Sequence, residues 1–261
     1  MNTLIRTDHF SFKLKRKINS TPNGTEYSTT FLIGNKNKPC LSLFLYSEIK
    51  KNQEDTVNYR IDYTTANLMN IDGLYDCIED DISEEDFNKF SFSKELLTSI
   101  IDFIKINYPH IKKINLDDAS YMPCNRKAKD TVDLLTYSVA HHSKTWYELF
   151  YKAYMRPLPK YKRYRSEVDK YSSEEFKALV SWTNFTHHIF IKSTPFAQEK
   201  LANNYELYKS LYENSRTFPI FFREMTKTLN KLDKCKFYKF WLEHFINSNI
   251  SFTRTWTIDV I

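Results

Sequence analysis

Two pairs of adjacent histidines, His141–His142 and His187–His188, carry the side chains best suited to bind a transition metal. Neighbouring side chains diverge by about 100° on a helix and point to opposite faces on a strand, so one pair cannot chelate an ion. A site would need one histidine from each pair and a carboxylate such as Asp117 or Asp118. The spacing follows no known zinc motif. We therefore predict no metal site.

Nucleophilic catalysis would need a thiol or hydroxyl beside a base, and Cys124 or Ser143 with one of the histidines could provide it. The chain has no G-x-S-x-G elbow and no cysteine-protease signature around these residues. The cysteines also form no C-x-x-C pair, which argues against a zinc ribbon or a thioredoxin-like site. We interpret these residues as structural.

Nucleotide binding through a glycine-rich loop is excluded by composition. The chain has only Gly24, Gly34 and Gly73. Neither the P-loop motif nor the Rossmann fingerprint can be assembled from these positions, and both need glycine where the backbone approaches phosphate.

Basic and aromatic residues alternate between Lys160 and Arg165 in a chain of formal net charge +6. Cations contact phosphates and rings stack on bases, so Lys160, Lys162, Arg163 and Arg165 are candidate nucleic-acid-binding residues. The alternative interpretation is a solvated basic loop.

The elements that would position these residues follow from hydrophobic periodicity. The N-terminal part alternates as about four antiparallel strands, with a hairpin turn at residues 22–24. Apolar residues at helical spacing predict a helix over 93–108 that ends before Pro109, and residues 112–117 alternate as a strand. The tail 251–261 also alternates, and we expect it to dock on a sheet edge.

A long helix is expected within residues 131–154, and mostly helical structure from Ser172 onward. Pro157 and Pro159 should resist helix formation, so we place a boundary there. The expected domains are 1–156, an α/β domain, and 157–261, a mostly helical C-terminal extension. The fold class is α+β.

The longest apolar runs fall far short of a membrane-spanning helix, and the N-terminus lacks the features of a secretory signal. We therefore expect a protein that does not span a membrane and is not secreted.

The order of helix 93–108, a strand near 112–118 and the segment 133–148 resembles the C-terminal half of the GCN5-related N-acetyltransferase (GNAT) fold. More narrowly, residues 116–120 and 144–148 are similar to motifs of GNAT-like proteins of large nucleocytoplasmic DNA viruses. The resemblance implies a mixed, mostly antiparallel sheet with packed helices, followed by the helical extension.

The family binds acetyl-CoA through a glycine-containing loop at the start of its central helix, where backbone N–H groups hold the pyrophosphate. The corresponding residues here, Phe90 to Lys94, contain no glycine. Side chains would crowd a backbone that must approach phosphate. Because this part of the resemblance lacks the glycine, we expect the chain to bind no cofactor. In an active enzyme, Phe92, Ser93 and Lys94 would bind acetyl-CoA and Tyr147 would be the catalytic residue.

These observations lead to the expectation of a catalytically degenerate acetyltransferase-like viral protein with a structural or interaction role. Its partners would be other viral proteins, and its location the host cytoplasm, at the viral factory, or the virion. The alternatives are an active N-acetyltransferase that uses acetyl-CoA and a basic nucleic-acid-binding protein.

Overall fold

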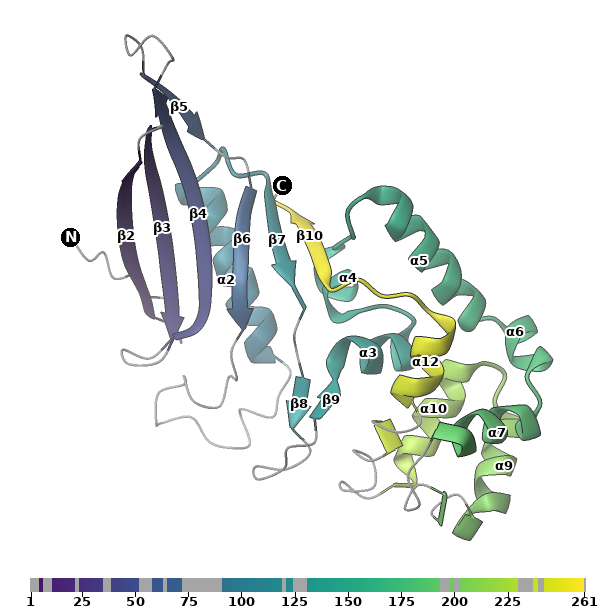
Figure 1. Cartoon of the computed structure of the whole chain (residues 1–261). Coiled ribbons are helices and arrows are strands. Elements are labelled where there is room, and N and C mark those ends of the chain that lie inside the picture. The colour runs from purple at the N-terminus through teal and green to yellow at the C-terminus, as the bar shows by residue number, and fades with distance from the viewer. Residues whose placement is uncertain are drawn as a thin grey trace. The chain divides into compact units, whose positions relative to one another are not determined.

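The computed structural model describes residues 5–6, 11–21, 24–34, 39–51, 58–62, 65–71, 91–118, 121–123, 131–192, 198–199, 202–229, 237–238 and 242–260. The protein mixes helices and strands, as expected for the α+β class (Figure 1). The segment 76–86, which is rich in aspartate and glutamate, lies outside the described residues.

The chain divides into two compact units, Met1–Asp117 with Thr255–Ile261, and Asp118–Arg254. This division differs from the boundary expected between residues 156 and 157. The helix that follows Pro157 is bonded to residues that precede it, because the hydroxyls of Tyr161 and Tyr164 both donate to Glu148. Residues on either side of Pro157 therefore belong to the same unit.

The first unit is built on one sheet with the order β1-β2-β3-β4-β6-β7-β10, and β5 pairs with β4 outside this path. Its strands are β1 (Ile5–Arg6), β2 (Ser11–Thr21), β3 (Gly24–Gly34), β4 (Pro39–Lys51), β5 (Asn58–Asp62), β6 (Thr65–Ile71), β7 (Lys113–Asp117) and β10 (Thr255–Asp259). Thr21 pairs with Gly24, so two residues connect β2 to β3 and the expected hairpin is confirmed.

Strands β6 and β7 form a parallel pair in this sheet, with Thr65 opposite Lys113 and Leu68 opposite Leu116. A parallel pair needs a long crossover, and helix α2 (Ser91–Asn107) lies within it (Figure 1). The buried side chains of Leu97, Ile100 and Ile104 follow helical spacing. The predicted helix 93–108 is confirmed to within two residues.

The C-terminal strand β10 pairs antiparallel with β7, and Trp256 lies opposite Leu116. The prediction that the tail docks on a sheet edge is confirmed. The chain therefore leaves the sheet after Asp117 and returns to it at Thr255. Residues 118–254 form an insertion between two adjacent strands, whereas the sequence had suggested an extension that runs to the C-terminus.

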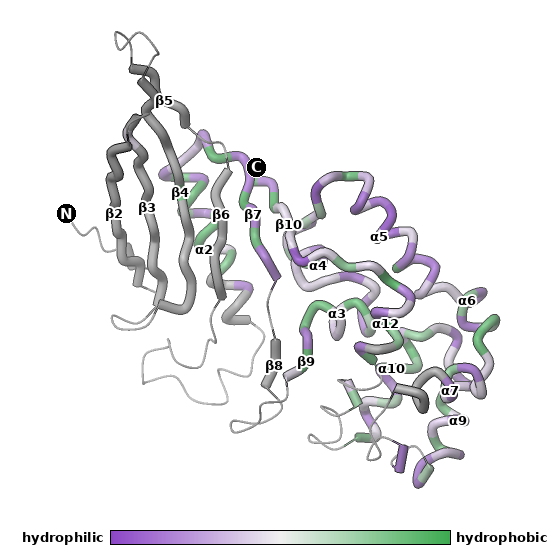
Figure 2. Tube along the Cα trace, viewed as in Figure 1, coloured by the Kyte–Doolittle hydropathy of each residue, from purple (hydrophilic) through white to green (hydrophobic). Residues whose placement is uncertain are grey.

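The second unit contains the short hairpin of β8 (Tyr121–Pro123) and β9 (Thr131–Asp133), followed by helices. The helices are α3 (Leu134–His142), α4 (Trp146–Tyr151), α5 (Leu158–Tyr171), α6 (Glu174–Leu179), α7 (Trp182–Lys192), α9 (Tyr205–Asn214), α10 (Phe218–Lys227) and α12 (Glu243–Asn249). Hydrophobic stretches are visible along α3 and α10 (Figure 2). Four fully buried phenylalanines, Phe185, Phe218, Phe221 and Phe222, form the centre of its core.

The single long helix expected within 131–154 is wrong. Asp133 caps α3 by accepting a hydrogen bond from the Leu135 N–H, and α3 ends at Ser143, whose φ of 57° is left-handed. Helix α4 begins after Thr145 and ends at Lys152, with a φ of 52°. Left-handed residues stop a helix, so capping replaces one helix with two.

The prolines at 157 and 159 do not prevent a helix, which corrects the prediction for this segment. Pro157 is the N-cap of α5 and Pro159 lies in its first turn. The N–H groups of a first turn have no partner inside the helix, so proline costs nothing there, and its fixed φ suits the start of a helix. In the described part of the chain, no helix is long and apolar enough to cross a membrane.

Candidate functional site

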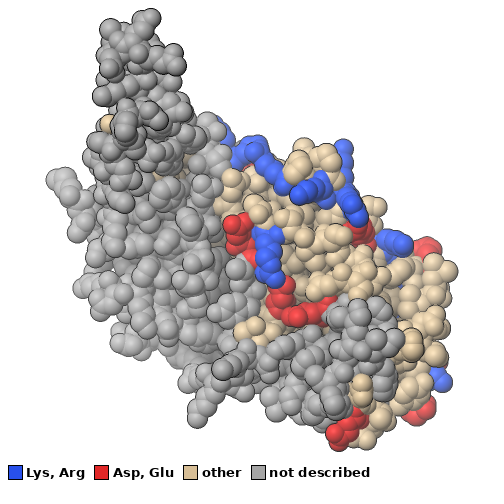
Figure 3. Space-filling view, viewed as in Figure 1, with Lys and Arg blue, Asp and Glu red and all other residues tan. Residues whose placement is uncertain are grey.

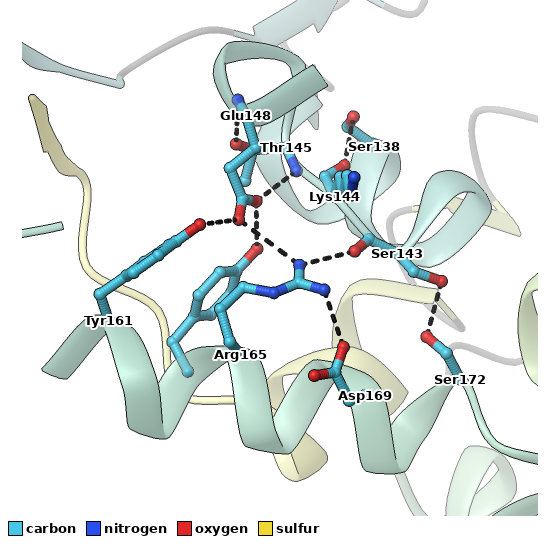
Figure 4. Close-up of polar contacts among 10 residues, drawn as sticks. Ser138, Ser143, Lys144, Thr145, Glu148, Tyr161, Arg165, Asp169 and Ser172 are labelled. Carbon is cyan, nitrogen blue, oxygen red and sulfur yellow. Dashed lines mark hydrogen bonds and ion pairs between the residues drawn. The ribbon is translucent and has the colours of Figure 1, made fainter. Parts of the chain in front are cut away.

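Several neighbours bond to the buried side chain of Glu148, on α4 in the second unit (Figure 4). Thr145 and Glu148 form a capping box. The Thr145 hydroxyl accepts from the Glu148 N–H at 3.2 Å, and Oε2 of Glu148 accepts from the Thr145 N–H at 2.8 Å. This arrangement satisfies two N–H groups that a helix start leaves open. It also fixes the Glu148 carboxylate toward the interior, where its side chain is 4% exposed.

Helix α5 supplies the other donors to this carboxylate. The Tyr164 hydroxyl donates to Oε2 at 2.9 Å, and the Tyr161 hydroxyl donates to Oε1 at 3.0 Å. Nη1 of Arg165 lies 3.4 Å from Oε1 and also donates to the carbonyl oxygen of Ser143 at 2.8 Å. Nη2 of Arg165 donates to Asp169 at 2.7 Å. The three side chains from α5 therefore converge on one buried anion (Figure 4).

The electrostatics of this cluster favour neutral tyrosines beside a charged carboxylate. Burial, followed by the charge of Glu148, raises the pKa of Tyr161 to about 12 and raises that of Tyr164 further. Burial alone would lower the pKa of Arg165, but Glu148 and then Asp169 raise it. Both tyrosines stay donors and Arg165 stays a cation at neutral pH. A buried charge with this many donors stabilises a particular packing of α4 against α5.

Tyr147, the residue that the acetyltransferase resemblance marks as catalytic, precedes Glu148 on α4 and belongs to the second unit. Its side chain is buried, at 4% exposure, and its ring contacts that of Trp146 with centroids 5.2 Å apart. Burial, and then the charge of Asp118, raise the pKa of its hydroxyl well above the ordinary value. The phenol is neutral and almost inaccessible from solvent.

The expected acetyl-CoA residues Phe92, Ser93 and Lys94 lie in the first turn of α2, in the first unit. Lys94 is exposed, and the side chains of the other two lie outside the described residues. The backbone thus places them at a helix N-terminus, as the resemblance requires, without the glycine that close phosphate contact requires.

The histidines of the first pair occupy different environments. His141 is 3% exposed, and its Nδ1 lies 2.9 Å from the carbonyl oxygen of Tyr137, so the neutral ring donates from Nδ1. Burial lowers its pKa to about 4. His142 and His187 are exposed, and the side chain of His188 is outside the described residues. Within the described part of the chain, no group of three potential ligands could hold a metal.

The candidate nucleophile Ser143 ends α3, and its hydroxyl is 2.6 Å from that of Ser172. Ser143 ends a helix in a left-handed conformation and is bonded to another serine, so its role is structural. Cys124 lies outside the described residues.

The four candidate nucleic-acid-binding residues all lie on α5 but differ in their contacts. Lys160 and Lys162 are exposed and make no ion pair with any described residue. Arg163 pairs at the surface with Glu167, one helical turn later, at 3.0 Å. Arg165 is bound within the Glu148 cluster. Lysine and arginine side chains lie over α5 in the space-filling view (Figure 3).

Sequence reasoning noted the segment 144–148 but assigned no role to Glu148. The T-x-x-E pattern of a capping box was a usable signal for the start of α4. The donors from α5 left no signal in the sequence. Tyr161 and Tyr164 follow Glu148 by 13 and 16 residues, and they bond to it only because two helices pack together. Comparison with family models, with curated proteins and with solved structures found no match.

Proposed function

We propose that this chain is a catalytically degenerate acetyltransferase-like viral protein that acts through binding to other proteins, in the virion or at the viral factory. In this proposal the sheet, α2 and the segment 133–148 correspond to the GNAT-like part. The crossover from β6 through α2 to the parallel strand β7 supports that correspondence, because it supplies the helix N-terminus where the family binds its cofactor. The helices of residues 157–254 are then an addition to the minimal fold.

The burial of Tyr147 is the observation that carries the proposal. A general acid must come within hydrogen-bond distance of the group that receives its proton. A side chain that is 4% exposed offers almost no surface to a substrate. Its neighbour Glu148 has both carboxylate oxygens occupied by protein donors, so it has a structural role in place of a catalytic one.

Apolar side chains at the surface of the second unit support a role in protein binding. Leu179, at the end of α6, is 78% exposed, and Tyr205 and Leu207, in the first turn of α9, are 37% and 47% exposed. The Tyr205 ring contacts Trp182, three residues after Leu179. Exposed apolar side chains of this kind can contribute to a surface that binds a protein partner.

Calorimetric titration with acetyl-CoA and with CoA tests the loss of the cofactor site. We expect no heat up to millimolar concentrations and no thermal shift. The double variant Phe90→Gly/Phe92→Gly is the matched control for backbone crowding at this position. Micromolar binding by the unmodified chain would contradict the proposal and favour an active N-acetyltransferase, for which Tyr147→Phe kinetics would be the next measurement.

Quantitative mass spectrometry of purified particles and of isolated viral factories tests the interaction role. We expect the chain in at least one of these fractions. The variant Leu179→Ser/Leu207→Ser should be depleted there, while Ile106→Ser, which changes a 79% exposed residue on α2, should not. Absence of the unmodified chain from both fractions would rule out the proposed role.

A further inference from the structure

One stretch of the sequence, from Leu149 to Ser166, is rich in positive charge. It contains Lys152, Arg156, Lys160, Lys162, Arg163 and Arg165 and no aspartate or glutamate. These six cations equal the formal net charge of the whole chain, +6, so the remaining residues are neutral overall. A field of one sign concentrated in this way attracts a polyanion.

Most of these cations are available to an external ligand. Lys152, Arg156, Lys160 and Lys162 are exposed and form no ion pair with a described residue. The pair of Arg163 with Glu167 is at the surface, where a side chain 76% exposed loses little by exchanging partners. Only Arg165 is held inside, by Glu148, Ser143 and Asp169.

The hydroxyls of Tyr161 and Tyr164, the tyrosines of α5 that lie within this segment, are directed toward the interior of the second unit. Tyr161 and Tyr164 donate to Glu148, and Tyr164 is 1% exposed. On a helix, Lys162 lies opposite the buried stripe of Tyr164, Val168 and Tyr171, and Arg163 lies about 100° from Tyr164. On α5 the alternation of basic and aromatic residues therefore separates into an outer set of cations and an inner set of rings, and this helix offers charge while the rings of Tyr161 and Tyr164 are held by Glu148.

We propose that the exposed cations of residues 152–163 bind the phosphate backbone of a nucleic-acid duplex without reading its sequence. Duplex phosphates are regularly spaced and dense, so a few cations can contact them with no base stacked on the protein. This activity is separate from the interaction role proposed above, which uses α6 and α9.

The test is fluorescence anisotropy with the full chain and a labelled DNA duplex of about 20 base pairs, beside a single strand of equal phosphate number. About four phosphate contacts predict a plot of log affinity against log salt with a slope of about −3 to −4. Affinity should then fall on the order of 100-fold between about 50 and about 200 mM salt. The duplex should bind at least as tightly as the single strand.

The variant Lys160→Gln/Lys162→Gln/Arg163→Gln should lose about 10-fold or more in affinity and flatten the salt slope. The matched control, Lys105→Gln/Lys112→Gln/Lys227→Gln, removes the same charge from exposed positions outside the segment and should change affinity by about 2-fold or less. All three substituted positions on α5 face solvent, so folding, checked by circular dichroism, should be retained.

Three outcomes would overturn the proposal. They are equal losses in the two triple variants, a clear preference for the single strand, and binding to anionic lipid vesicles in place of the duplex.

Discussion

The hydroxyl of Tyr164 donates a 2.9 Å hydrogen bond to Oε2 of Glu148 in the interior of the second unit. The two residues are on different helices, and both side chains are nearly inaccessible to solvent. A buried anion is costly unless donors surround it, so this contact makes the packing of α5 against α4 specific.

Removing the Glu148 carboxylate should strongly destabilise the second unit. Glu148→Ala leaves Tyr161, Tyr164 and Arg165 without their shared acceptor, and we expect the free energy of unfolding to fall by about 3–5 kcal/mol. Glu148→Gln keeps an acceptor oxygen and should cost less. Urea unfolding followed by tyrosine and tryptophan fluorescence measures both, with the exposed Glu175→Ala as control. A loss no greater than in that control would contradict the structural role.

The two tyrosines should contribute unequally although each makes one bond to the same carboxylate. Tyr164→Phe leaves a buried carboxylate oxygen short of a donor and should cost about 1.5–3 kcal/mol, because hydrogen bonds to charged groups are the stronger ones. Tyr161 is half-buried, so water can replace its hydroxyl, and Tyr161→Phe should cost less. The same unfolding measurement ranks them. Equal losses of stability in the two variants would contradict the prediction that burial makes the Tyr164 bond the more important one.

His141 should make stability depend on acid pH. Burial lowers the pKa of its imidazole from 6.5 to about 4 in the folded chain. The unfolded state therefore binds a proton that the native state does not, and the free energy of unfolding falls as the pH drops from about 6.5 toward 4. The difference in pKa corresponds to about 3 kcal/mol.

Comparison of His141→Gln with the unmodified chain isolates this contribution, because the acid-sensitive carboxylates are common to both. The gap between their stabilities should narrow as the pH falls from about 7 to about 4. The exposed His187→Gln is the control and should show no such narrowing. A constant gap for His141→Gln would mean that the imidazole is not held neutral.

Lys152→Gly should stabilise the protein. Lys152 ends α4 with a φ of 52°, and its N–H donates to the carbonyl oxygen of Tyr147. A residue with a Cβ is strained in this left-handed conformation, whereas glycine adopts it freely, so we expect a gain of about 0.5–1 kcal/mol. Lys144→Gly, at an exposed position without positive φ, should destabilise instead. Thermal unfolding of both variants distinguishes these opposite signs.

Local patterns in the sequence were enough to predict several elements. The spacing of Leu97, Ile100 and Ile104 predicted α2, and alternation predicted β7 and β10. These patterns are informative because each element buries one face, and the period of the apolar residues reports that face directly. Local patterns did not predict the helix ends that are set by capping or by left-handed residues. At Ser143, a run of apolar and aromatic residues conceals the end of a helix.

The sequence by itself therefore determined the mixed fold class, the scarcity of glycine and the run of positive charge near α5. Only the tertiary structure decided that β10 returns to β7, that Glu148 has donors from a second helix, and that Arg165 is bound while Lys162 is exposed. The physical reason is that these relationships join residues from separate elements. A local pattern reports which side of an element is buried, whereas the partner that covers it depends on how the elements pack.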